Sequence, residues 1–431
     1  MLKTFTLKNG IKVATYNLPN VKSIHIRISS KGGSIVESKV NNGVAHFMEH
    51  ILVQGTPSYP TVEDLSLFIE SLAGNYNAQT EKLLISFFIT TPATHIEDAI
   101  KITKEVFFDP LFAKDAIERE RGALLNEIKQ NMDSHYFELN RYFWETRVKK
   151  EHPLTLFTGG ALDVVSKLTR DDLVNYWQKY FLSKNSYLLI SGNFEEKKLI
   201  KLLEKYFESI DSKKVFSGFP KMSDLDLSEK EVFIRFDQKL GINYIDITWP
   251  SIKMEDTLKL RLIQNLALTI LGGLRNSRLF KLLRSQRGLV YSIGSSASIL
   301  PGLGLGYISS QVTSENLVEV LDLTFKELFT FVHNGPTDEE LSFAKNYLSN
   351  QWFMAFDHPS VIAEWIENDL HWNDKIRLPE QYLEILKEIK KEDLLKLMQK
   401  YWDFAKLNLV IQGQIEDSKE NREKYMEYLN L

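Results

Sequence analysis

The sequence of 431 residues contains no cysteine. Disulfide bonds and thiol catalysis are therefore excluded, and a metal ion could be bound only through histidine, aspartate or glutamate side chains. The chain also has no uninterrupted apolar run close to the roughly 20 residues that cross a bilayer, so we expect no membrane anchor.

Clustered positive charge is absent as well. The formal net charge is -4, and lysine and arginine are interspersed with aspartate and glutamate along the chain. This distribution offers no electrostatic surface for nucleic acid or for an acidic membrane, and it favours a small or neutral partner.

The composition is that of a globular protein, with 43% hydrophobic, 12% aromatic and 26% charged residues. The length predicts more than one domain. The first residues, MLKTFTLKNGIKVATYNLP, predict a strand, an Asn-Gly turn and a second strand, without the features of a targeting segment. We therefore expect a cytoplasmic protein.

An internal repeat divides the chain. The segment DDLVNYWQKYFLSKNSYLLISG at 171–192 aligns without a gap with EDLLKLMQKYWDFAKLNLVIQG at 392–413, at an offset of 221 residues. Each half is thus predicted to end in a helix followed by a strand, as expected of a duplication. We expect an N-terminal domain at 1–212, a polar linker at 213–230 and a C-terminal domain at 231–431.

Within each half, strand-like and helix-like segments occur in separate runs. Strand patterns are found at 24–30, 83–91, 245–250 and 305–312, and helical spacing of apolar residues at 96–108, 113–134, 256–271, 314–331 and 337–355. Such runs favour an α+β fold: two homologous domains, each a largely antiparallel β-sheet packed with helices.

The segment GVAHFMEH at 43–50 carries the first chemical signal. On a helix, His46 and His50 project from one face and can bind a single Zn²⁺, while Glu49 lies beside them, suited to remove a proton from a water at the metal. Alternatively, two histidines of the core could flank a glutamate on the surface. The pattern HxxEH is uncommon enough by chance to favour the metal site.

A catalytic zinc ion needs a third ligand from the protein. The segment KDAIERERGALLNEIKQNMD predicts a helix on which Glu120 and Glu127 are seven residues apart and lie on nearly the same face. Taken alone, carboxylates at this spacing are more often solvated surface groups than ligands.

With 76 residues between His50 and Glu127, the sequence resembles the M16 metallopeptidases, the inverzincins, which include pitrilysin, insulin-degrading enzyme and the mitochondrial processing peptidase. The blocks GVAHFMEHILVQGT, ERERGALLNEIKQ and LFKLLRSQRGLVYSI resemble its short single-chain branch. The resemblance covers essentially the whole chain. It implies one Zn²⁺ per chain bound by His46, His50 and Glu127, with Glu49 as the general base and Glu120 as a carboxylate that supports the site without binding the metal.

The resemblance also extends to the second half, which has no histidine before His333 and no second HxxEH. Arg284 and Tyr291, in LLRSQRGLVYS, match a pair that binds substrate at the zinc in this family. Both side chains are donors suited to a peptide carbonyl that gains negative charge. Without the resemblance, an arginine at a helix end and a tyrosine at a strand start would be the simpler interpretation.

A further block, AGNYNAQTEK at 73–82, resembles the edge strand that pairs with the substrate backbone in this family. It places Asn77 and Ala78 in that strand and implies recognition of main chain rather than of side chains. Gln79 stands where the family usually has an aromatic residue, which puts the fine specificity in doubt.

The resemblance therefore implies a zinc metalloendopeptidase that hydrolyses unstructured peptides or processes peptide leaders, within a chamber enclosed by one chain or by a dimer. Because this chain has both the zinc residues and the Arg–Tyr pair, we expect a homodimer that acts on peptides. The alternatives are a non-catalytic scaffold of the same fold and one subunit of a heterodimeric peptidase.

Overall fold

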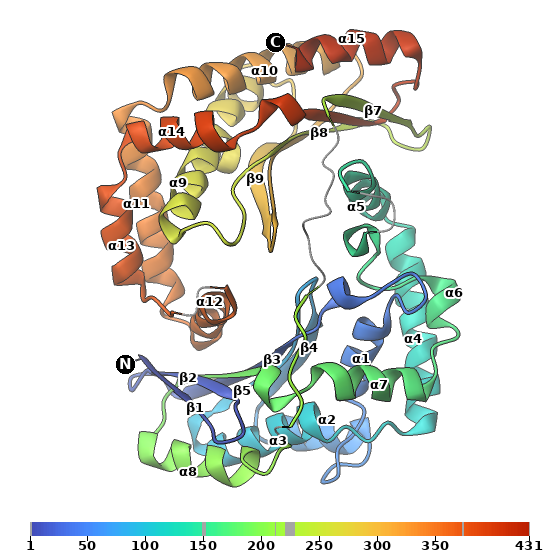
Figure 1. The fold of residues 1–431 in the computed structure, drawn as a ribbon, viewed down its shortest axis with the longest axis vertical. Helices are drawn as coiled ribbons and strands as arrows, with labels where there is room; N and C mark the ends of the chain where they lie inside the picture. The colour runs from blue at the N-terminus through green and yellow to red at the C-terminus, as the bar shows by residue number, and fades with distance from the viewer. Residues whose placement is uncertain (1, 149–151, 212, 220–228, 373–374, 431) are drawn as a thin grey trace. The chain divides into compact units, whose positions relative to one another are not determined.

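The protein is described here by a computed structural model of residues 2–148, 152–211, 213–219, 229–372 and 375–430. The chain forms two compact units (Figure 1), and neither is a continuous stretch of sequence. The first unit comprises Met1–Glu138, Glu151–Pro220 and Met354–Ile376; the second comprises Leu139–Lys150, Lys221–Phe353 and Arg377–Leu431. Part of the expected linker, at 220–228, lies outside the described residues.

The first unit is built on a six-stranded sheet. Its strands, in spatial order, are β1 (Leu2–Thr6), β2 (Lys12–Asn17), β6 (Ser186–Gly192), β3 (Ser23–Lys31), β5 (Leu84–Pro92) and β4 (Asn75–Thr80). Neighbouring strands are antiparallel except for β2 and β6, which are parallel. Among the described strands, β4 pairs only with β5 and so lies at the edge of this sheet.

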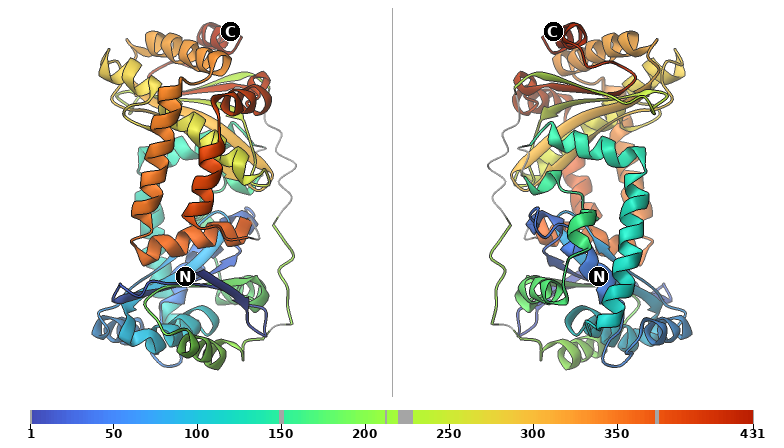
Figure 2. Two further views of the ribbon diagram at one scale, coloured as in Figure 1. Left: turned by 90° about the vertical axis from the view of Figure 1, so that its left-hand side faces the viewer. Right: turned by 90° about the vertical axis from the view of Figure 1, so that its right-hand side faces the viewer.

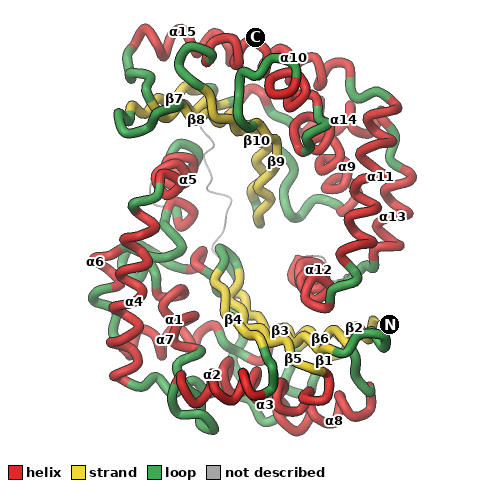
Figure 3. Tube along the Cα trace, turned by 180° about the vertical axis from the view of Figure 1, so that it is seen from behind, coloured by secondary structure: helices red, strands yellow, loops and turns green. Residues whose placement is uncertain are grey.

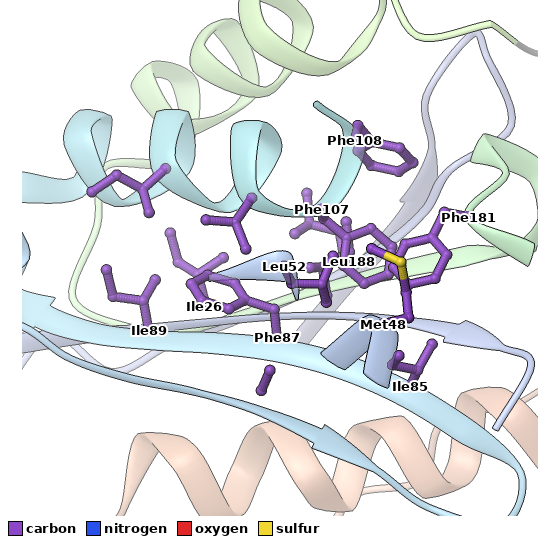
Figure 4. Close-up of a cluster of buried hydrophobic side chains, with 14 of the residues drawn as sticks. Ile26, Met48, Leu52, Ile85, Phe87, Ile89, Phe107, Phe108, Phe181 and Leu188 are labelled. Atoms are coloured by element: carbon purple, nitrogen blue, oxygen red, sulfur yellow. The ribbon is translucent and has the colours of Figure 1, made fainter. Parts of the chain in front are cut away.

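Helices from the N-terminal half cover one face of this sheet. They are α1 (Val44–Leu52), α2 (Val62–Ser71), α3 (Ile96–Phe108), α4 (Lys114–Met132), α6 (Leu162–Val165), α7 (Arg170–Tyr180) and α8 (Glu196–Phe207). Figure 4 shows the core, in which Ile26 and Phe87 of the sheet lie near Met48 and Leu52 of α1 and Phe107 of α3. These side chains are fully buried, and removing their apolar surface from water stabilises the docking of α1 on the sheet.

The opposite face of the sheet is covered by α12 (Pro359–Trp372), a helix from the second half of the chain (Figures 1, 2 and 3). Its apolar contact is a buried cluster made by Ala14, Leu189, Ile362, Ala363 and Ile366.

An ion pair is buried in the same contact. Arg27 Nε of β3 donates to Glu367 Oε2 of α12 at 2.8 Å, and the two side chains are only 3% and 6% exposed. Because an unpaired charge is costly at such a site, the pair ties this helix to this sheet.

The second unit has a five-stranded sheet. Its strands, in spatial order, are β7 (Glu231–Phe236), β11 (Asn408–Gly413), β8 (Asn243–Pro250), β10 (Leu303–Val312) and β9 (Ile293–Leu300), with only β7 and β11 parallel. Its helices from the second half of the chain are α9 (Leu258–Leu268), α10 (Leu317–Asn334), α11 (Asp338–Ala355), α13 (Pro379–Glu388), α14 (Lys391–Tyr401) and α15 (Lys419–Leu429). None of the described helices is long and apolar enough to span a membrane.

The second unit includes a segment from the N-terminal half, 139–150, which contains most of α5 (His135–Glu145). Its anchor is Arg147, which is fully buried and donates through Nε to Thr248 Oγ1 at 2.9 Å. The guanidinium group lies 4.0 Å from the centre of the Phe143 ring and interacts with the charge of Asp246 on β8. The two halves therefore exchange one helical segment each, which the sequence division at 213–230 does not anticipate.

The duplication and the α+β fold class expected from the sequence are confirmed. The order β2-β6-β3-β5-β4 in the first sheet corresponds to β7-β11-β8-β10-β9 in the second. The repeated segments form α7 and β6 in one unit and α14 and β11 in the other. The strands and helices predicted from apolar spacing are also present, although α9 stops at Leu268 and continues as a π-helical turn, Thr269–Gly273.

The register of the duplicated sheets relates two interactions between opposite charges, Arg27 with Glu367 and Asp246 with Arg147. Ile26 is paired with Ile190, and Ile245 is paired with Ile411, the residue equivalent to Ile190 in the repeat. The next residue along the strand is Arg27 in the first sheet and Asp246 in the second. The exchanged segments carry the complementary charges, Glu367 and Arg147, so the two interactions have opposite polarity.

Candidate metal centre

Helix α1 carries the HxxEH residues and is held by its apolar face. Six of its nine residues are buried: Val44, Ala45, Phe47, Met48, Ile51 and Leu52. This leaves His46, Glu49 and His50 on the partly exposed face. Helical periodicity thus places the three polar side chains together at the surface of the core.

The three side chains are close enough to share one ion. Each offers a ligand atom, and these atoms lie within 4.8 Å of one another. The ring centroids of His46 and His50 are 4.9 Å apart, and the rings are nearly perpendicular at 86°.

Helix α4 brings Glu127 to this group. Oε1 of Glu127 lies 3.7 Å from His46 Nε2, and Oε2 lies 3.4 Å from His50 Nε2. Buried Leu124 and Ile128 hold α4 against the core, while the Glu127 side chain stays 43% exposed. The residues predicted as ligands are therefore brought together from two helices.

The other nitrogen of each imidazole has a protein partner. His50 Nδ1 lies 3.0 Å from Glu120 Oε2, and His46 Nδ1 lies 3.3 Å from the carbonyl oxygen of Gly159. A proton on each Nδ1 satisfies these contacts and leaves the lone pair of Nε2 available to a metal. The resemblance to the family predicted a supporting role for Glu120, whereas Gly159 could not be predicted, because a backbone carbonyl leaves no signal in the sequence.

The donor set fits Zn²⁺. Two atoms bound to one tetrahedral zinc ion at about 2.0–2.1 Å lie roughly 3.3–3.4 Å apart. The distances from Glu127 to His50 and to His46, 3.4 and 3.7 Å, are close to that separation. Two imidazoles and one carboxylate are also a typical ligand set of a catalytic zinc ion with an open coordination position. A second carboxylate, that of Glu49, lies alongside.

Glu37, at the start of α1, and Lys82, which interacts with its charge, have shifted pKa values. Burial raises the pKa of Glu37 to about 7, against the opposing effect of its hydrogen bonds with Gly43, Ala45 and Asn42. Burial also lowers the pKa of Lys82 to about 8, and the nearby charge of Glu37 opposes this shift. Neither residue was predicted from the sequence to belong to the site.

The predicted edge strand adjoins α1. Asn77 and Ala78 pair with Phe88 and Phe87 of β5, and the other side of β4 is unpaired among the described strands. Thr80 Oγ1 donates to the carbonyl of Ala45 on α1 at 3.3 Å. The end of the edge strand is thereby fixed to the helix that carries His46.

Arg284 and Tyr291 lie together in the second unit. Arg284 belongs to a second π-helical turn, Phe280–Ser285, and donates to the carbonyl of Val290 at 3.2 Å. Its guanidinium carbon is 5.3 Å from the centre of the Tyr291 ring, and Tyr291 is 78% exposed. Such exposure of a tyrosine leaves its hydroxyl available to a ligand.

The fold and the site define a class of protein: a duplicated α+β chain whose first half carries a centre of two histidines and one carboxylate suited to zinc. The chain belongs to the M16 peptidase family. Residues 12–153 match the family model described as Insulinase (Peptidase family M16), and residues 167–348 match that of the Peptidase M16 inactive domain.

Relatives are similar over nearly the full chain. An uncharacterised zinc protease of Rickettsia felis is 26% identical over 412 residues, which cover 94% of this chain and 96% of that protein. The mitochondrial-processing peptidase subunit beta of Lentinula edodes is 26% identical over 415 residues, 92% of this chain and 87% of its own. These names support a family of zinc peptidases.

Solved structures show the same fold. A peptidase M16 inactive domain from Pseudomonas fluorescens superposes with a TM-score of 0.87 at 18% identity, covering 97% of this chain and 99% of the other. A protease from Helicobacter pylori superposes with a TM-score of 0.84 at 18% identity, covering 96% and 99%.

Proposed function

We propose that this protein is a zinc-dependent endopeptidase that hydrolyses unstructured peptides or processes peptide leaders. The observation that carries the proposal is the convergence of His46 and His50 on the two oxygens of Glu127, at 3.7 and 3.4 Å. The zinc proteases among its relatives support the same chemistry.

In this proposal His46, His50 and Glu127 hold one zinc ion per chain. A bound zinc ion supplies Lewis acidity, which lowers the pKa of water and polarises a carbonyl group. Glu49 is the general base: it takes a proton from the attacking water and delivers it to the amine that leaves when the peptide bond breaks. Glu120 holds the His50 ring in place through Nδ1.

The substrate would be held by its main chain. The unpaired side of β4, with Asn77 and Ala78, can accept an extended peptide as a further strand. Arg284 and Tyr291 offer donors for a substrate carbonyl, where they would stabilise developing negative charge. Folded proteins would be poor substrates, because strand addition requires an extended segment.

The test replaces Glu49 by glutamine, which keeps the size of the side chain but removes the base. We expect peptide cleavage to fall by roughly 100- to 10,000-fold, while about one zinc ion per chain is retained. Cleavage is measured on a quenched fluorescent peptide, and zinc by elemental analysis of the same sample. Parental activity with zinc still bound would rule out Glu49 as the base.

The second candidate is a non-catalytic scaffold or the partner subunit of a heterodimeric peptidase. It is favoured by the match of residues 167–348 to an inactive domain and by the similarity to a protein named as a subunit. Metal analysis separates the candidates, because a scaffold has no need of zinc. We favour the enzyme, since the whole set of metal-binding side chains is present.

We also propose that the enzyme forms a homodimer, because one chain contains both the metal-binding residues and the Arg284–Tyr291 pair. Light scattering coupled to size-exclusion chromatography gives the mass in solution. An active protein with the mass of one chain would contradict the dimer without affecting the chemistry.

A further inference from the structure

We propose that Asn42 and Glu37 are positioning residues for His46. Together they hold the loop 157–160 against the start of α1, so that the carbonyl of Gly159 meets His46 Nδ1. This inference rests on the proposed zinc centre and adds to it the support of the first histidine.

Glu37 takes the place of a side-chain cap at the start of α1. The N-cap residue is Gly43, which has no side chain to satisfy the first backbone N–H groups of the helix. Instead, Glu37 Oε2 accepts from the Gly43 N–H at 3.0 Å, and Oε1 accepts from the Ala45 N–H at 2.8 Å. The carboxylate therefore fixes the turn directly before His46.

Asn42 connects this cap to the loop. Its Nδ2 donates to Glu37 Oε2 at 2.9 Å and to the carbonyl of Phe157, also at 2.9 Å. Both Asn42 and Glu37 are 3% exposed, so water does not replace either contact readily. One amide group thus joins the helix cap to a residue two positions before Gly159.

Two glycines allow the loop to lie this close. Gly43 and Gly160 have φ values of 99° and 98°, a backbone conformation that residues with a side chain rarely adopt. A Cβ atom on Gly160 would lie 2.6 Å from Gly43 Cα, closer than atoms approach. Close backbone packing and the Asn42 amide therefore act on the same short loop.

The two histidines differ in how they are supported. Glu120 is a side chain and can adjust to His50, whereas the Gly159 carbonyl is part of the backbone and moves only with its loop. The placement of His46 consequently depends on whatever holds residues 157–160. Outer hydrogen bonds of this kind orient a metal-binding imidazole and raise its affinity.

The experiment compares zinc binding by the full-length chain with and without Asn42→Ala. We expect the dissociation constant for zinc, measured by competition with a chelator, to rise about 10-fold or more. The visible absorption of the Co²⁺-loaded protein should also change, because it reports the geometry of the ligands. The melting temperature of the metal-free protein is recorded in parallel.

Thr169→Ala is the matched control. Thr169 caps α7 in the same unit by accepting from the Asp172 N–H, and its side chain donates to Asp172 Oδ2 rather than to a residue of the metal centre. This variant should lower the melting temperature while leaving zinc affinity and the Co²⁺ spectrum unchanged. A purely structural role for Asn42 would give the same result as this control and would overturn the inference.

Glu37→Gln is a second variant, milder because it keeps the size of the side chain and one acceptor oxygen. We expect weaker zinc binding than in the parent but stronger than in Asn42→Ala. If both variants bind zinc as tightly as the parental chain, the inference is wrong but the proposed function stands. Failure of the parental chain to bind zinc overturns the proposed function as well, so the two failures are distinguishable.

Discussion

Nδ1 of His50 and Oε2 of Glu120 are 3.0 Å apart, although 70 positions separate the two residues in the sequence. We predict that Glu120→Ala raises the dissociation constant for zinc by roughly 10- to 100-fold, because the His50 ring loses the acceptor that orients it. Glu118→Gln is the control on the same helix, since its side chain is 68% exposed and pairs with Arg121. Equal zinc affinity in the two variants would show that Glu120 does not support the site.

The buried pair of Arg27 and Glu367 gives a prediction about stability. Arg27→Met leaves Glu367 buried without its partner, and we expect a loss of about 3–5 kcal/mol in the free energy of unfolding. Glu367→Gln should also destabilise the protein. Urea denaturation measures both.

A double-mutant cycle then tests whether the pair ties α12 to its sheet. The combined variant Arg27→Met/Glu367→Gln should be more stable than the sum of the single losses predicts, because no unpaired charge remains. Losses that simply add would show that the two side chains act independently. The exposed pair of Lys391 and Asp338 is the comparison, and its removal should have little effect.

Tyr291→Phe removes only a hydroxyl group. We expect kcat to fall by roughly 100-fold if that hydroxyl donates to the substrate in the transition state, with zinc content and melting temperature unchanged. Tyr136→Phe is the control, because Tyr136 is also well exposed, at 67%. Unaltered kinetics in Tyr291→Phe would count against its role.

His25 makes the stability depend on pH. Burial lowers the pKa of His25 to about 4, with a smaller contribution from the charge of Arg27, whereas the unfolded chain has the ordinary value near 6.5. As the pH falls from 6.5 to 4, the unfolded chain binds a proton that the folded chain does not. Stability should therefore decrease over this window, by up to about 3 kcal/mol.

Replacing His25 by asparagine tests this effect, since an amide can keep the contact that Nδ1 makes with Thr90 Oγ1. Urea unfolding between pH 4.5 and 7.5 should show a smaller decrease towards low pH in the variant than in the parent. Glu37 has the opposite effect: its raised pKa lets the folded chain bind an extra proton below about 7. This contribution is common to both proteins and cancels in the comparison, so parallel curves would exclude His25 as the cause.

Local patterns in the sequence predicted much of the fold and part of the site. The spacing of apolar residues predicts α1 and α4, and the interval of four residues places His46 and His50 on one face of a helix. Helical periodicity alone left Glu120 and Glu127 as ordinary surface carboxylates, and only the resemblance to a family assigned them roles. The repeat predicted the duplication because its residues recur in the same order.

By itself, then, the sequence determined which side chains share a face of a helix or strand, since that depends only on local geometry. The tertiary structure decided which faces meet: that Glu127 reaches both imidazoles, that a carbonyl at Gly159 supports His46, and that α12 packs on the first sheet through Glu367 and Arg27. These contacts join residues far apart in the chain, and backbone atoms such as the Gly159 carbonyl are the same in every residue. Their positions therefore follow only from the packing of the complete chain.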